Sequence, residues 1–321
     1  MLETEATRRP RQRQRQNQRR HPAPQDRPAR PSAICVRLRD LSPPSATCAL
    51  RPMAIKTMAA ELFELFLLGG ATEKRYRRLR PEVEALPWGT LNPSQFAPEL
   101  VIEARKSWTL AAYQEHRTGA ACAEALGALI AARAPVDLIA VATRFPLDEM
   151  AHVEMCARLA HELGGGTHVE HDPDDLIPGP EKGLSPLLRA ADCVVRYFCV
   201  GEAISIPLLH GTWKAARHPL VKAVLGRIVR DEAAHGMFGW TFLDWAEDEL
   251  DASDREHLAH VAGETIDALT SSWKGPRTHP NAGAADLNTL GWMETDAYFE
   301  LAARSLETRV LAPLRARGIF P

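Results

Sequence analysis

Apolar residues recur every three or four positions along most of the chain after residue 58, and little of it alternates as strands do. This spacing predicts helices over 58–68, 72–86, 96–133, 137–163, 185–215, 219–249, 252–272 and 293–316. We therefore expect an all-α protein. The segment 164–184 is rich in Gly, Pro and Asp, and so long a link between helices is typical of a crossover between two helix pairs.

Two of the predicted helices interrupt their apolar stripe with a glutamate and a histidine three residues apart. LDEMAHVEM contains Glu149 and His152, and RDEAAHGMF contains Glu232 and His235. Residues three apart lie on one face of a helix, so each pair occupies the side that should be buried. An ExxH pair alone is a weak signal, but two pairs that each follow an aspartate are unexpected by chance.

The two other long helices each place a lone glutamate in their apolar stripe. Glu202 interrupts the helix 185–215, and Glu115 interrupts the helix 96–133 on the face that also carries Cys122. Glu103 and Glu124 lie on the same helix as Glu115 and remain alternatives to it.

Four buried carboxylates would be prohibitively costly if they stayed ionised and unpaired. Two divalent metal ions would balance their four negative charges. A donor set of carboxylate oxygen and imidazole nitrogen suits iron or manganese better than the metals that prefer thiolate. The alternative, two Glu–His pairs on helix surfaces, is disfavoured because the rest of each stripe is apolar.

This arrangement resembles the ferritin-like di-iron carboxylate superfamily, chiefly bacterial ferritin-like proteins of uncertain activity and, more distantly, the arylamine N-oxygenase group. The resemblance covers about 95–250 and implies a ferritin-like four-helix bundle with additional N- and C-terminal helices. It implies six metal ligands, which are Glu115, Glu149, His152, Glu202, Glu232 and His235. Asp148 and Asp231 look like the residues that support ligand histidines from behind, because an aspartate can accept the free imidazole N–H.

The chain departs from particular families in three places. The N-oxygenases carry another histidine ligand where this chain has Ile228, which puts N-oxygenation in doubt. The tyrosyl-radical reductase subunits carry a tyrosine where this chain has Cys156, so we expect no stored radical there. No CxxC pair is present for a rubredoxin-type iron site.

Composition suggests four regions. Residues 1–52 are rich in Arg, Pro and Gln and carry twelve Arg against four acidic residues. We interpret them as a disordered extension or a start codon placed too early, rather than a basic arm for nucleic acid. Short helices are expected over 53–94, the bundle over 95–250, and helices packed on the bundle over 251–321.

The six cysteines indicate the compartment. They form no CxxC pair and four lie in helical patterns, which is typical of reduced thiols in a cytoplasmic protein. No run approaches 18 apolar residues, so we expect no membrane span.

These observations lead to three functional hypotheses. The first is an oxidoreductase in which two metal ions, iron or with manganese as an alternative, activate O2 to oxidise a small organic substrate. It needs no catalytic residue beyond the metal centre and takes electrons from a separate reductase, because no flavin or iron–sulfur motif is present. A homodimer is one assembly that is compatible with this first hypothesis. The other two are a ferroxidase or iron-handling protein without organic substrate, and a bundle that serves as a metal-free scaffold.

Overall fold

Helices make up most of the described protein, as the apolar spacing predicts. The computed structural model describes residues 61–171, 176, 183–271 and 284–321, so the predicted extension 1–52 lies outside the described residues. Within the described part, the strands are β1 (Glu61–Leu62) and β2 (Glu170–His171), which pair antiparallel. The all-α class is therefore confirmed.

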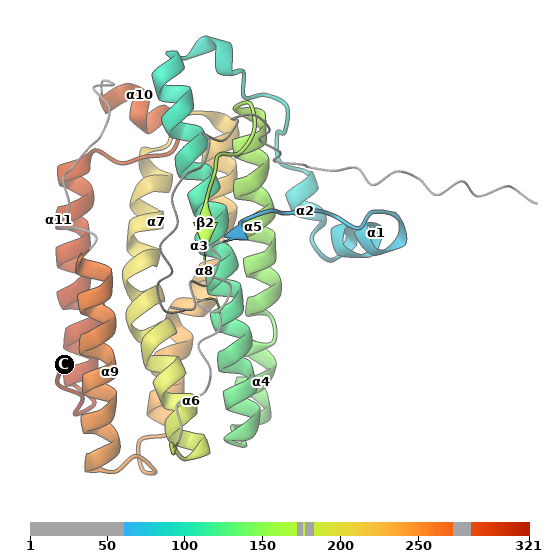
Figure 1. Cartoon of the computed structure of the whole chain (residues 1–321). Helices are drawn as coiled ribbons and strands as arrows, with labels where there is room; N and C mark the ends of the chain where they lie inside the picture. Colours follow the sequence, from blue (N-terminus) through green and yellow to red (C-terminus); the bar gives the residue numbers. More distant parts are fainter. Residues whose placement is uncertain (1–60, 172–175, 177–182, 272–283) are drawn as a thin grey trace, which may run out of the picture.

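Four long helical segments lie side by side (Figure 1). They are α3 (Pro98–Ala131), α5 (Phe145–Glu162), α8 (Pro219–Trp245) and the continuous stretch α6 (Pro186–Val194), η3 (Val195–Glu202) and α7 (Ala203–Ala215). The chain leaves α5 at the upper end in Figure 1 and enters α6 at the lower end. The link between them thus joins opposite ends of the bundle, as a crossover does.

Further helices flank this bundle. On one side, α9 (Ala252–Ser271) packs against η3, and α11 (Thr295–Ser305) packs against α7. The chain continues from α11 through the π-helix η5 (Leu306–Leu311) to α12 (Ala312–Arg315), and α10 (Ala284–Thr289) lies near the upper end of the bundle (Figure 1). On the opposite side lie α1 (Gly70–Leu79) and α2 (Pro81–Glu84).

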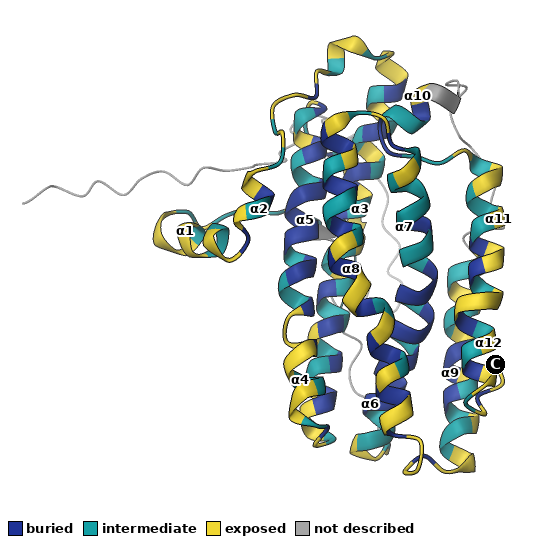
Figure 2. Cartoon of the chain, turned by 180° about the vertical axis from the view of Figure 1, so that it is seen from behind, coloured by how far each residue is buried: buried dark blue, intermediate teal, exposed yellow. Residues whose placement is uncertain are grey.

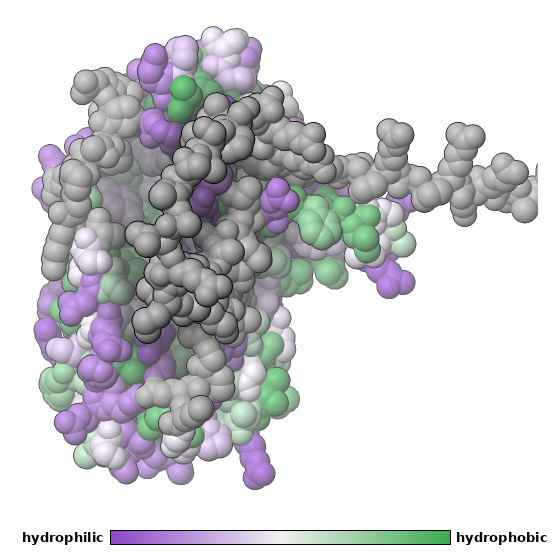
Figure 3. Space-filling model, in the orientation of Figure 1, coloured by the Kyte–Doolittle hydropathy of each residue, from purple (hydrophilic) through white to green (hydrophobic). Residues whose placement is uncertain are grey.

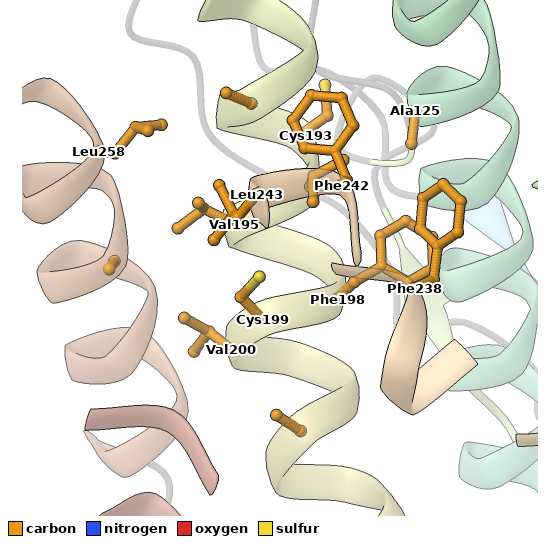
Figure 4. Close-up of a cluster of buried hydrophobic side chains, with 14 of the residues drawn as sticks. Ala125, Cys193, Val195, Phe198, Cys199, Val200, Phe238, Phe242, Leu243 and Leu258 are labelled. Atoms are coloured by element: carbon orange, nitrogen blue, oxygen red, sulfur yellow. The ribbon is translucent and has the colours of Figure 1, made fainter. Parts of the chain in front are cut away.

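The core is divided into two apolar clusters. Figure 2 shows buried residues along the inner faces of the long helices, most densely on α5. One cluster contains Phe145 and Phe238, and Figure 4 shows part of it between η3 and α8. The other contains Met155 and Ile228. On both α5 and α8 the Glu–His pair lies between residues of the two clusters, so a polar layer separates them.

Several predicted boundaries were wrong, for physical reasons. The predicted helix 58–68 does not form over 61–68, where the chain is extended and β1 pairs with β2. Pro81 is the first residue of α2 and Pro146 the second residue of α5, because proline fits the first turn of a helix but has no N–H with which to continue a preceding one. The predicted helix 137–163 is consequently two helices, α4 (Val136–Ala142) and α5. α8 ends at Trp245, four residues before the predicted end, and α10 was not predicted.

The stretch 186–215 is long and apolar enough to cross a membrane by composition, which the count of uninterrupted apolar residues did not detect. More than half of its apolar window, 56%, is buried among the other helices, and core helices commonly have this composition. Packing inside the bundle therefore accounts for its apolar character. At the surface, Figure 3 shows apolar residues on the side where α1 and α2 lie. Phe66 and Leu68, which precede α1, and Leu79 at the end of α1 are exposed.

Candidate metal centre

Each of the four long segments contributes an acidic side chain to the polar layer. α3 provides Glu115, α5 provides Glu149 and His152, the last residue of η3 is Glu202, and α8 provides Glu232 and His235. All but Glu115 are buried, and the Glu115 side chain is only 15% exposed. The helix positions follow from the three-residue spacing, which aligns each Glu with its His one turn along the helix.

The structure brings these six side chains together in two groups. Glu115, Glu149, His152 and Glu232 form one group, and Glu149, Glu202, Glu232 and His235 form the other. In each group the four donor atoms lie within 4.8 Å of one another. Glu149 and Glu232 belong to both groups, as carboxylates that bridge two ions would.

The alternatives to Glu115 lie elsewhere. Glu103 Oε1 accepts a hydrogen bond from Lys106 at the surface. Glu124 accepts hydrogen bonds from Arg189 and from the Tyr197 hydroxyl. Neither belongs to the two metal groups, so the helix face that carries Glu115 is the one turned to the centre.

Both imidazoles turn Nδ1 toward the glutamates. His235 Nδ1 lies 3.0 Å from Glu232 Oε2, 3.1 Å from Glu149 Oε1 and 3.9 Å from Glu202 Oε1. His152 Nδ1 lies 3.2 Å from Glu232 Oε1, 3.5 Å from Glu149 Oε2 and 3.6 Å from Glu115 Oε2. Two donors that are each about 2.1 Å from one ion, at a right angle, are about 3 Å apart. These separations therefore suit donors that share an ion.

Several of these buried atoms have no hydrogen-bond partner. They are both carboxylate oxygens of Glu149, Oε2 of Glu232, Nδ1 of His152, and both ring nitrogens of His235. Buried polar groups in folded proteins are almost always paired, so such a concentration requires an explanation. A bound cation provides one, because it satisfies acceptor atoms that point at a common position. The six residues could therefore hold metal ions.

No protein-family model and no curated protein matches this chain.

An aspartate lies behind each histidine of the centre. In both cases the aspartate belongs to the helix opposite the one that carries the histidine. Asp231 of α8 places Oδ2 3.4 Å from Nε2 of His152 on α5. Asp148 of α5 places Oδ2 3.9 Å from Nε2 of His235 on α8, just beyond hydrogen-bonding distance. The two DExxH segments thus face each other crosswise, and the Asp231 contact at Nε2 leaves Nδ1 of His152 available for a metal, while Asp148 lies in the corresponding place behind His235.

Sequence reasoning missed two arginines that hold these aspartates. Arg227 Nη2 lies 2.7 Å from Asp231 Oδ1 and 3.0 Å from Glu82 Oε1. Arg144 Nε donates to Asp148 Oδ2 at 3.0 Å, and its Nη2 lies 3.9 Å from Asp231 Oδ1. The signal was present, because an arginine precedes the aspartate by four residues in both segments, giving RxxxDExxH twice.

The Asp231 contact leads to a test. We expect Asp231→Asn to lower the affinity for a metal ion at His152 about 10- to 100-fold, because the charge that orients and polarises the imidazole is lost. Competition titration with a chromophoric chelator will measure this. Asp192→Asn is the matched control, since Asp192 is also buried and lies 3.0 Å from His257 Nε2, away from the centre. Equal metal affinities in Asp231→Asn and Asp192→Asn would contradict the assigned role.

Burial and mutual repulsion shift the ionisation of the glutamates. Burial raises the pKa of Glu115 to about 7 and that of Glu202 to about 8. Burial also opposes ionisation of Glu232, but the adjacent imidazoles outweigh it and lower the Glu232 pKa to about 2. Burial disfavours protonation of His152 and His235, yet the surrounding carboxylates raise the pKa of both. Without metal, the centre therefore retains protons that metal ions would displace.

These pKa shifts predict that the metal-free protein loses stability as pH rises from about 5 to 8. The pKa of Glu115 and of Glu202 is raised above the ordinary value of 4.5, so the native state keeps protons that the unfolded chain releases. Their contribution to the free energy of unfolding is complete below pH 4.5 and is lost as the pH rises through about 7 to 8. The raised histidine pKa values act in the same direction above pH 6.5. Each differing proton changes the free energy of unfolding by about 1.4 kcal/mol per pH unit.

Urea unfolding of chelator-treated protein at pH 5, 6.5 and 8 measures this dependence. Metal-saturated protein should show the opposite slope, because metal ions compete with the same protons. A metal-free protein whose unfolding midpoint rises with pH over this range would contradict the prediction.

Apolar side chains close the centre at one end. The Phe145 ring lies 4.1 Å from the His235 ring between centroids, and Phe145, Phe198 and Phe238 are in mutual contact. Burial raises the pKa of the Cys122 and Cys156 thiols well above the ordinary value, so both stay protonated. Among the described residues, neither thiol belongs to a metal group. The surroundings are thus apolar and the donors are oxygen and nitrogen.

Proposed function

We propose that this chain is a ferritin-like di-iron carboxylate protein that activates O2 and oxidises a small organic substrate, with manganese as an alternative for one or both ions. One observation carries the proposal. Glu149 and Glu232 are shared between two donor groups, and each group has its own histidine and its own further glutamate. Four glutamates and two histidines on four long helical segments are the ligand set of ferritin-like di-metal proteins.

The charge balance supports two ions rather than one. Four glutamates meet at the centre, and all but Glu115 are fully buried there. A single divalent ion would leave two carboxylates to be neutralised by retained protons, whereas two ions neutralise all four. Oxygen donors outnumber nitrogen donors and thiolate is absent from both groups, which favours iron or manganese over zinc or copper.

Each residue has a distinct role in this proposal. Glu115 and His152 would hold one ion, Glu202 and His235 would hold the other, and Glu149 and Glu232 would contribute to both sites. When bound and reduced, the two ions supply the electrons that O2 requires. Asp231 orients the His152 imidazole, Asp148 lies behind the His235 imidazole, and the Ser205 hydroxyl donates to Glu202 Oε2 at 3.1 Å and so orients that carboxylate.

The apolar clusters on both sides of the polar layer support an organic substrate. Phe145, Phe198 and Phe238 exclude water on one side of His235. On the other side, Ile228 and Met155 belong to the second apolar cluster. Water exclusion favours reactions whose oxidant would otherwise be consumed by solvent.

The test uses protein loaded anaerobically with two Fe(II) per chain and then exposed to O2. The proposal expects O2 uptake to stop when the bound ions are oxidised and to resume when a chemical reductant is added. With reductant present, a panel of small aromatic and aliphatic compounds should give an oxidised product by mass spectrometry. Uptake sustained by added Fe(II), with no organic product, would overturn the proposal in favour of a ferroxidase.

A pair of double variants controls for nonspecific iron chemistry. Glu232→Ala with His235→Ala removes one Glu–His pair from the centre. Glu264→Ala with His260→Ala removes an exposed Glu–His pair on α9, whose Glu264 Oε1 and His260 Nε2 lie 3.2 Å apart. Reductant-dependent O2 uptake should be lost in the first variant and retained in the second.

A further inference from the structure

Gly239 allows α8 to lie unusually close to η3. A Cβ atom at Gly239 would lie 2.7 Å from Cys199 Sγ, 3.0 Å from Phe198 Cβ and 3.1 Å from the Cys199 backbone nitrogen. Figure 4 shows Phe198 beside Phe238, and Cys199 is the next residue of η3. Since the backbone nitrogen and Phe198 Cβ both move only with η3 itself, any larger residue at Gly239 would displace η3.

The contact lies next to the metal centre along both helices. Gly239 is four residues after His235, which is about one turn of α8. Cys199 is three residues before Glu202, which is the last residue of η3. A displacement of η3 at Cys199 is therefore passed on to Glu202 within one turn.

The π-helical geometry of η3 makes Glu202 dependent on this contact. An α-helix advances 100° per residue, whereas the i→i+5 bonds of a π-helix place an extra residue in the turn and rotate the residues after it about the helix axis. Of the four ligand-bearing segments, the one that carries Glu202 has its α-helix interrupted in this way next to its ligand. The wide turn and the missing side chain of Gly239 occur at the same level.

We propose that Gly239 is a positioning residue, which sets the distance between the Glu202 carboxylate and the metal ion that His235 also binds. This inference rests on the proposed two-metal centre. It is specific to one ion, because Glu202 belongs to the group with His235 and not to the group with His152. The other five ligands lie on α3, α5 and α8 rather than on η3.

The experiment compares metal content and metal affinity in three single variants. Wild-type protein should hold about two ions per chain, and Gly239→Ala should hold about one at the same metal concentration. The affinity of the site that contains Glu202 should fall about tenfold or more. Glu202→Ala should also retain one ion. Gly236→Ala is the matched control on α8, because its added Cβ would meet only Ile206 Cδ1, the end of a flexible side chain, and it should keep both ions.

The outcomes separate this inference from the proposed centre. A folded Gly239→Ala that binds two ions with wild-type affinity overturns the positioning role and leaves the centre intact. Wild-type protein that binds no metal overturns both. Should Gly239→Ala fail to fold, Cys199→Ala with Gly239→Ala removes the sulfur contact and keeps the contact with the backbone nitrogen. That double variant should bind one ion, and two ions would again overturn the inference.

Discussion

For the proposed two-metal centre, we expect that replacing Glu232 by alanine removes both metal ions, whereas replacing Glu115 by alanine removes one. The difference arises from the grouping of donors, since Glu232 belongs to both groups and Glu115 to one. Elemental analysis after gel filtration should give about two ions per chain for the wild type, none for Glu232→Ala and one for Glu115→Ala. The contrast between two single glutamate variants is a stronger test than the loss of metal in either variant alone.

Glu154→Ala is the control for this experiment. Glu154 is also a buried glutamate of the bundle, but it forms ion pairs with Arg80 at 2.9 Å and with Arg77 at 3.1 Å. Its loss should lower stability, because it leaves buried arginine charge unpaired, and it should leave metal content unchanged. Loss of metal in Glu154→Ala would mean that destabilisation alone explains the result for Glu232→Ala.

Removal of the metal ions will lower the melting temperature by about 10 °C or more. An ion present at 100 times its dissociation constant stabilises the native state by about 2.7 kcal/mol, so two ions contribute about 5 kcal/mol. For a chain of this size, each kcal/mol corresponds to roughly 2 °C. Metal removal also leaves buried carboxylate oxygens of Glu149 and Glu232 without a hydrogen-bond partner, which acts in the same direction.

Thermal unfolding followed by circular dichroism, before and after chelation and after metal is restored, measures the effect. Glu232→Ala provides the control, because its melting temperature should respond little to chelator or metal. A wild-type melting temperature that does not change on chelation would contradict the prediction.

The helices and the buried faces that carry the glutamates could be predicted from the sequence, because both depend on local periodicity. Glu149 and His152 could be assigned to a buried face from the apolar residues around them, and the lone Glu202 was found in the same way. The choice of Glu115 over Glu124 was harder. Glu124 is paired with Arg189 and Tyr197 through contacts that join residues more than 60 positions apart, which a single sequence does not reveal.

Other features could not be predicted, because they depend on tertiary contacts. Leu62 and the residues after it read as an apolar helix, yet β1 pairs with a segment of the crossover link. The π-helix η3 leaves no signal in an apolar stripe, and its close approach to Gly239 is a contact with another helix. Arg144 and Arg227 were overlooked because their spacing to the aspartates becomes meaningful only once α5 and α8 are known to face each other.

The crosswise support of the histidines links metal release to the separation of two helices. His152 on α5 is held by Asp231 on α8, and His235 on α8 faces Asp148 on α5. Some eighty residues lie between these partners in the chain. Movement of α5 away from α8 would therefore weaken the proposed binding of both ions at once. Spontaneous metal exchange should accordingly follow the opening rate of the bundle, and hydrogen exchange of the α5 amides should report on the same event.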